Sequence, residues 1–277
     1  MILDKTYEQA LTVFNNRCDS IDSLFIKEMN DIDNAINEGY YIEAVSDNIM
    51  DNLKAWFANI ITEIRRFISD IKNGFMHEAK DLGYSVRLSS METELKKMKK
   101  EGKKEVKMTD YKTLQKEYLK YRNEIKSYAT KFVKLKYKST LDFDDDMKKF
   151  EDICEKYDKR LDEIAKNKIT VSIDEALRFV ESEKTGNSLV IDNLNDLSKD
   201  VSDIRDIASN ALTSESLIGS SALNKRDNRS EAQKLKDASH HVKTNVSVGI
   251  HRATNGLCKF TRKHVSRMMF KVVLFTA

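Results

Sequence analysis

The sequence predicts an all-α protein, either an elongated helical bundle or a set of antiparallel helical hairpins with coiled-coil-like seams. Its 277 residues include no proline and only eight glycines, so the residues that end helices and shape tight loops are scarce. Apolar residues recur at alternating steps of three and four, which is the spacing of one helix face. Charged residues make up 34% of the chain, above the roughly one quarter that is typical, and they suit solvated helix faces.

The first predicted helix covers residues 7–36, and Gly39 provides the first plausible turn after it. Steps of four and three along one face define this helix. That face consists of Tyr7, Leu11, Phe14, Cys18, Ile21 and Phe25, continued by Met29, Ile32 and Ile36.

The second predicted helix, residues 53–75, has the widest apolar stripe in the chain and includes the only tryptophan. A stripe of this kind is typical of a core helix or of a helix that lies on a membrane. Acidic residues interrupt its polar face, which favours packing against a core or a partner. The amphipathic face consists of Leu53, Trp56, Phe57, Ile60, Ile64, Ile68, Ile71 and Phe75.

Residues 96–107, KKMKKEGKKEVK, interrupt the apolar pattern with a run of lysines around Gly102. This composition indicates a solvated hinge between helices, and a phosphate-binding patch is the alternative.

Two heptad seams follow, and tyrosines dominate the first. Because a buried tyrosine hydroxyl needs a hydrogen-bond partner, we expect that seam to face a half-wet helix interface. The first seam consists of Tyr111, Leu114, Tyr118, Tyr121 and Ile125 and continues to Leu135. The second and more regular seam consists of Val190, Leu194, Leu197, Val201 and Ile204. Seams of this kind predict helical hairpins or a rod that pairs with copies of itself.

Between the seams, the acidic run DFDDD at 142–146 opens a helix whose apolar face runs from Met147 to Ile164. Residues 168–172, KITVS, are the one stretch that indicates an extended strand. Ser172 and Glu175 then have the spacing of a capping box at the start of a further helix.

The pattern divides the chain into four parts. Residues 1–95 contain the N-terminal amphipathic helices, and 96–212 contain the long heptad-patterned helices. Residues 213–230 are small, polar and aperiodic, which indicates a linker. Residues 231–277 form a basic amphipathic helical segment.

This last segment is electrically distinct because Asp237 is the final acidic residue. The forty residues after it carry seven cations, so the net charge of +3 leaves −4 for the first 237 residues. We expect the segment to bind an acidic partner surface, nucleic-acid phosphates or anionic lipid, with the protein surface favoured. The cations are Lys243, Arg252, Lys259, Arg262, Lys263, Arg267 and Lys271.

No motif predicts a catalytic, cofactor or metal site, so we expect a protein that is not an enzyme and needs no cofactor. Cys18, Cys154 and Cys258 lie far apart and are expected to be reduced, packed residues. The DFDDD run resembles the opening of a calcium loop, but Met147 replaces the required glycine and Ile153 the terminal glutamate. No signal peptide is recognisable at the N-terminus.

Residues 43–75, EAVSDNIMDNLKAWFANIITEIRRFISDIKNGF, together with the Lys/Asn/Ile/Asp-rich composition and the basic tail, carry a family resemblance. In these features the chain resembles long helical virion proteins of tailed bacteriophages that infect low-GC bacteria. The resemblance implies a structural role in the head interior, at the head–tail interface or at the tail interface. It also implies a location in the virion, and in the bacterial cytoplasm during assembly.

The leading hypothesis is therefore a non-enzymatic assembly protein that binds copies of itself or other subunits through its seams, with a basic C-terminal anchor. The first alternative is a membrane-active helical protein of the pore-forming or effector type, which would insert residues 53–75 or the basic segment. The second alternative is a nucleic-acid-binding helical module.

Overall fold

The computed structural model describes residues 84–134, 140–185, 188–213 and 231–275, together with isolated positions between 54 and 69. The predicted helix at 7–36 and the linker at 213–230 lie outside these residues, apart from Thr213. Helices account for 83% of the residues that the structure describes, and a small antiparallel sheet accompanies them. The elements are α3 (Tyr84–Lys100), β1 (Glu105–Thr109), α4 (Tyr111–Lys134), α5 (Thr140–Ile164), β2 (Lys168–Ser172), α6 (Ile173–Lys184), α7 (Leu189–Thr213), α8 (Glu231–Phe270) and β3 (Leu274–Phe275).

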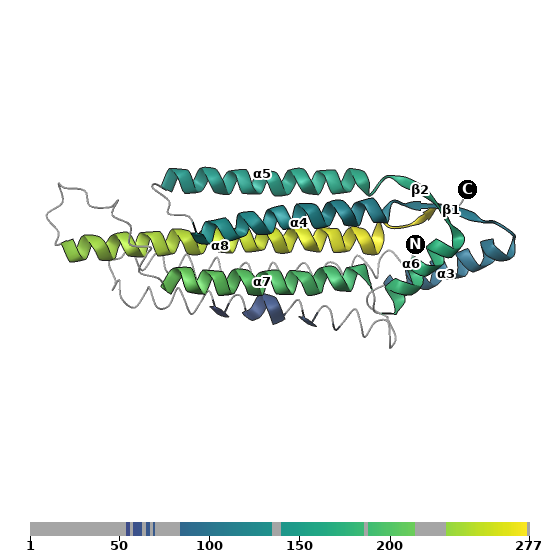
Figure 1. Ribbon diagram of the computed structural model, residues 1–277, viewed down its shortest axis with the longest axis horizontal. Coiled ribbons are helices and arrows are strands. Elements are labelled where there is room, and N and C mark those ends of the chain that lie inside the picture. The colour runs from purple at the N-terminus through teal and green to yellow at the C-terminus, as the bar shows by residue number, and fades with distance from the viewer. Residues whose placement is uncertain are drawn as a thin grey trace.

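The four long helices α4, α5, α7 and α8 lie side by side along the long axis of the molecule (Figure 1). Helices α4 and α7 run away from the sheet, and α5 and α8 run back towards it. With 40 residues α8 is the longest of the described helices, and at 1.5 Å per residue it is about 60 Å long. It contacts α4, α5 and α7, and α4 likewise contacts the other three, so α8 and α4 together occupy the centre of the group.

Because α8 lies at the centre of the long helices, the basic C-terminal segment is part of the interior of the molecule. Its apolar face is buried against the other long helices, with Ile250, Ala253 and Leu257 fully enclosed. The sequence suggested a segment that follows a linker and reaches outwards to a partner. In the structure, α8 completes the interior that α4, α5 and α7 leave open between them.

At one end of the long helices, three short strands form an antiparallel sheet in the order β2-β1-β3. The β2 strand is the predicted KITVS run, and its Val171 lies opposite Val106 of β1. The β1 strand falls partly within the predicted hinge, where Val106 and Met108 alternate inwards and are buried. The hydroxyl of Thr109 donates to the carbonyl of Lys271 at 2.8 Å, which joins the sheet to the end of α8.

The end with the sheet also contains α3 and α6, which pack against each other. As the capping-box spacing predicts, the Ser172 hydroxyl accepts a hydrogen bond from the backbone N–H of Glu175 and caps α6. At the other end of α6, the buried Glu183 carboxylate accepts from Ser188 at 2.6 Å and from the Leu189 backbone at 2.8 Å. It also accepts from the Tyr84 hydroxyl of α3, so a single carboxylate ties α3, α6 and α7 together.

Candidate functional site

The predicted basic cluster is brought against α5, where two aspartates lie between three of its cations. Asp158 pairs with Lys263 and Arg267, and Asp162 pairs with Arg267 at 3.0 Å and with Lys271 at 2.5 Å. Each aspartate therefore bridges two cations that are one helical turn apart on α8. The same step of four residues repeats on both helices, as it must for parallel neighbours in register.

We call this alternating row of charges the ladder; it consists of Lys263, Asp158, Arg267, Asp162 and Lys271. Arg267 is its buried centre. Only 4% of its side chain is exposed, and it also donates to the Asp158 backbone carbonyl at 3.1 Å. Burial acts to raise the pKa of Asp162, but hydrogen bonds from Arg267 and Lys271 outweigh it and hold that pKa at about 2. Asp162 thus stays ionised at neutral pH, and its ion pairs hold the last turns of α8 against α5. A cavity of about 200 Å³ lies beside the ladder, and Arg262 and Ser266 contribute to its lining.

The remaining predicted cations have different surroundings. Arg252 and Lys259 are exposed, and they lie one heptad apart on the outer surface of α8. Arg262 is half-buried. Lys243 is in the helical part of α8 whose side chains the structure does not describe.

Both predicted heptad seams are buried inside the chain. In the first seam Leu114, Tyr118 and Ile125 are fully buried, and in the second Val190, Leu194, Val201 and Ile204 are. Tyr111, Tyr121 and Leu197 retain only small exposed fractions. In the first seam Tyr118 stacks on His264 of α8 and Tyr121 stacks on Tyr157 of α5. Helix α7, which carries the second seam, packs against α8 and α4. The surfaces that the sequence suggested for binding partners are therefore occupied by this chain's own helices.

Of the eight residues of the predicted amphipathic face at 53–75, the structure describes only Ile60. Ile60 and its neighbour Ile61 are buried, as a packing role predicts. The other members of this face lie outside the described residues: Leu53, Trp56, Phe57, Ile64, Ile68, Ile71 and Phe75.

A row of buried polar side chains, which the sequence analysis missed, lies between α4, α7 and α8. Gln115 of α4 and Asn193 of α7 exchange two amide hydrogen bonds of 2.8 and 3.0 Å. His264 Nε2 lies 3.0 Å from the Gln115 side-chain oxygen, so three helices meet at one amide. One heptad further along α4 and α7, Arg122 pairs with Asp200 at 2.5 Å, and both residues are buried.

The positions of these polar residues contain a signal that could have revealed them. Gln115 and Arg122 each follow a seam residue of α4, and Asn193 and Asp200 each precede a seam residue of α7. Residues that flank the apolar positions of a heptad often pair across helices and set the register between them. A search for matching polar pairs one heptad apart on the two seams would have aligned α4 with α7.

Burial disfavours the charged forms of three titratable side chains in the interior: His264, His251 and Cys154. Burial, with a smaller contribution from Arg267, holds the pKa of His264 well below its ordinary value. Burial likewise lowers the pKa of His251 to about 3, assisted by Arg252, and raises that of Cys154 to about 12. Histidine that stays neutral and a thiol that stays protonated are poor candidates for metal-free acid–base or nucleophilic chemistry at neutral pH.

Among the described residues, no three His, Cys, Asp or Glu side chains are close enough to share a metal ion. None of the described helices has the length and apolar character needed to cross a membrane. Comparison with protein-family models, with curated proteins and with solved structures returns no match.

Proposed function

We propose that the protein is a non-enzymatic structural protein whose long helices form a stiff body and which self-associates through charged outer surfaces. The observation that carries this proposal is the burial of both heptad seams, since it leaves charged residues as the main means of contact. Of the described large apolar side chains, Val86 alone is strongly exposed. A surface of this composition associates through charge and hydrogen bonds rather than through apolar patches.

Two helices of the chain have complementary charge. Helix α7 contains five aspartates and two cations, and Asp192 and Asp206 are exposed two heptads apart. Helix α8 has no carboxylate after Asp237, and Arg252 and Lys259 are exposed one heptad apart. The outer surface of α7 in one copy therefore suits the outer surface of α8 in another. This arrangement supports a homo-oligomer and replaces the seams as the proposed interface.

The experiment is light scattering on the full chain across protein concentrations at low and at physiological salt. Self-association through charge predicts an oligomer at low salt whose mass falls as salt rises, because screening weakens exposed ion pairs. The double variant Arg252→Glu/Lys259→Glu, and likewise Asp192→Lys/Asp206→Lys, should be monomeric. Combining all four substitutions should restore association, because opposite charges face each other again.

Lys148→Glu/Lys156→Glu on the outer surface of α5 serves as the matched control and should leave the oligomer unchanged. A wild-type chain that stays monomeric at every concentration and salt would remove the proposal. An oligomer that survives both reversals would show that another surface makes it.

In this proposal the chain is one subunit of a virion, the particle that its resemblance to helical proteins of tailed bacteriophages implies. The predicted anchoring role of the basic segment cannot be tested by deleting 231–277, because that deletion removes α8 from the interior. Substitutions at the exposed Arg252 and Lys259 test the anchoring role and leave the interior intact. Binding of the wild-type chain to anionic vesicles at physiological salt, without oligomers, would favour the membrane-active alternative.

A further inference from the structure

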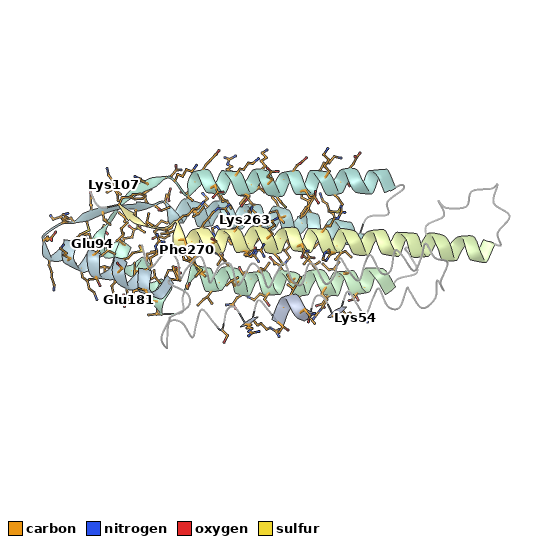
Figure 2. The ribbon with its side chains drawn as sticks, turned by 180° about the vertical axis from the view of Figure 1, so that it is seen from behind. Lys54, Glu94, Lys107, Glu181, Lys263 and Phe270 are labelled. Atoms are coloured by element: carbon orange, nitrogen blue, oxygen red, sulfur yellow. The ribbon has the colours of Figure 1, made fainter. Side chains whose placement is uncertain are left out.

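The end of the molecule that contains the sheet carries a concentration of unpaired positive charge. Figure 1 shows the turn between α3 and β1 at the far tip of the long axis, and Figure 2 labels Lys107 of β1 at the same end of the molecule. We use the name tip lysines for five exposed residues that have no ion pair with another described residue: Lys97, Lys100, Lys103, Lys104 and Lys107. Their neighbours Lys96 and Lys99, by contrast, pair with Glu92 and Asp174.

The backbone that carries the tip lysines is fixed by hydrogen bonds. Helix α3 ends at Lys100, and Gly102 in the turn after it has a φ of +79°, the left-handed conformation that glycine adopts without strain. Gly102 N–H donates to the Lys99 carbonyl and Lys103 N–H to the Met98 carbonyl, each at 3.1 Å, which is the Schellman pattern. Ile173 N–H then donates to the Lys104 carbonyl at 3.0 Å, and β1 pairs with β2 from Glu105 onwards.

Stabilisation of the end of α3 explains only some of the tip lysines. Lysines in the last turn of a helix interact favourably with its carbonyl ends, and this explains Lys97 and Lys100. The effect fades within one turn, so it does not explain Lys103, Lys104 and Lys107, which lie beyond the end of α3. Residues 96–107 hold seven lysines and two glutamates, a net charge of +5, of which +3 remains once Lys96 and Lys99 are set aside because they pair with Glu92 and Asp174. This concentration of like charge is costly unless an anion offsets it.

The composition of the tip narrows the class of anion. The half-buried ring of Phe275, which lies opposite Lys107 in the sheet, has the Lys168 ammonium 3.8 Å from its centroid. Residues 96–107 themselves contain no aromatic side chain, so bases of a single strand have little to stack on at the tip. Their apolar residues Met98 and Val106 are buried, so nothing there can insert into a bilayer. They also contain no arginine, the residue that reads guanine by a bidentate contact. Lysines alone supply point charges that neutralise phosphates without reading bases.

We propose that the tip lysines bind the phosphate backbone of double-stranded nucleic acid irrespective of its sequence. The five lysines are on three consecutive segments at the end of the long axis: the last turn of α3, the turn after it and β1 (Figure 1). If all five neutralise a phosphate, the logarithm of affinity falls with the logarithm of salt with a slope of about −4.5. Affinity should then drop roughly 500-fold between about 50 and 200 mM salt.

The test is fluorescence anisotropy of a labelled mixed-sequence DNA duplex, titrated with the full chain over that range of salt. In Lys97→Gln/Lys100→Gln/Lys104→Gln, the magnitude of the salt slope should decrease by about 2.7. The matched control Lys116→Gln/Lys148→Gln/Lys156→Gln removes the same charge from exposed positions on α4 and α5 and should keep the wild-type slope. All six side chains are exposed, so both variants should retain the wild-type circular dichroism spectrum.

Three results would overturn the proposal. One is a wild-type chain that does not bind the duplex even at low salt. Another is an equal loss in both triple variants, which would mean that net charge alone is responsible. The third is binding to phosphatidylserine vesicles with none to the duplex, since that would identify a lipid surface as the anion. A second duplex of unrelated sequence should bind with the same affinity.

Discussion

His264 of α8 lies flat against Tyr118 of α4, with ring centroids 3.7 Å apart and planes only 3° from parallel. The Tyr118 hydroxyl lies 3.1 Å from the Thr261 hydroxyl, one turn before His264 on the same helix. On the other side of the imidazole, Nε2 donates to the side-chain oxygen of Gln115. The second ring nitrogen, Nδ1, is buried with no hydrogen-bond partner among the described residues. A protonated imidazole would need an acceptor there, so this packing disfavours the charged form.

Stability should therefore fall as the pH drops below about 6.5, the ordinary pKa of histidine. The folded-state pKa values of His264 and His251 are lowered by burial, so the unfolded chain binds more protons in this range. Each buried neutral histidine then costs about 1.4 kcal/mol of unfolding free energy per pH unit below 6.5. Urea unfolding between about pH 7 and pH 5.5 measures the slope, and His264→Gln should reduce it by about one proton. An unchanged slope in that variant would show that His264 does not titrate on unfolding.

Arg267 should be the most costly of the predicted cations to remove. Replacing a buried ion-paired residue with Met leaves Asp158 and Asp162 short of a partner, for a loss of about 3–5 kcal/mol in unfolding free energy. Lys271 pairs with the same Asp162 but has 52% of its side chain exposed. Lys271→Met should cost less than about 1 kcal/mol, because exposed ion pairs contribute little. Chemical unfolding of both variants measures the difference, and equal losses would contradict the central position of Arg267.

Gly256 of α8 lies directly against Phe150 of α5. A Cβ atom at this position would lie 2.6 and 2.9 Å from two ring carbons of the buried Phe150. Alanine normally stabilises a helix by about 1 kcal/mol relative to glycine, but here the contact requires the ring to move. We expect Gly256→Ala to lower the unfolding free energy by about 1–3 kcal/mol. Phe150→Leu should reduce that penalty in the double variant, and a purely additive cycle would show that the two residues do not compete for space.

The sequence was sufficient to predict the helical class and the apolar face that α4 buries, because both follow from local spacing. Leu114, Tyr118 and Ile125 have the helix period, and the structure buries all three. The β2 strand was predictable from its β-branched residues and Ser172 from its capping spacing. The β1 strand was not, because lysines and glutamates surround Val106 and Met108 and conceal their alternation.

The place of α8 could not be predicted, because its buried side is partly polar. Thr254, Thr261 and His264 are fully buried, yet in the sequence they have the character of an exposed face. Their burial depends on partners such as Gln115 and Tyr118, which are well over a hundred residues earlier in the chain. Likewise, Lys263 and Arg267 look unopposed in the sequence because Asp158 and Asp162 belong to a distant helix. A helix's own residues do not show which distant side chains will face it.

The central position of α8 also affects how the protein folds. During synthesis α4, α5 and α7 are made before α8, so their apolar seams have no complete partner until residues 250–268 follow. The Tyr118–Thr261 and Gln115–His264 contacts span 143 and 149 residues. Contacts between such distant residues slow folding, because a long loop must close before they form. Ribosome-bound chains that stop short of α8 should therefore expose these seams and depend on chaperones.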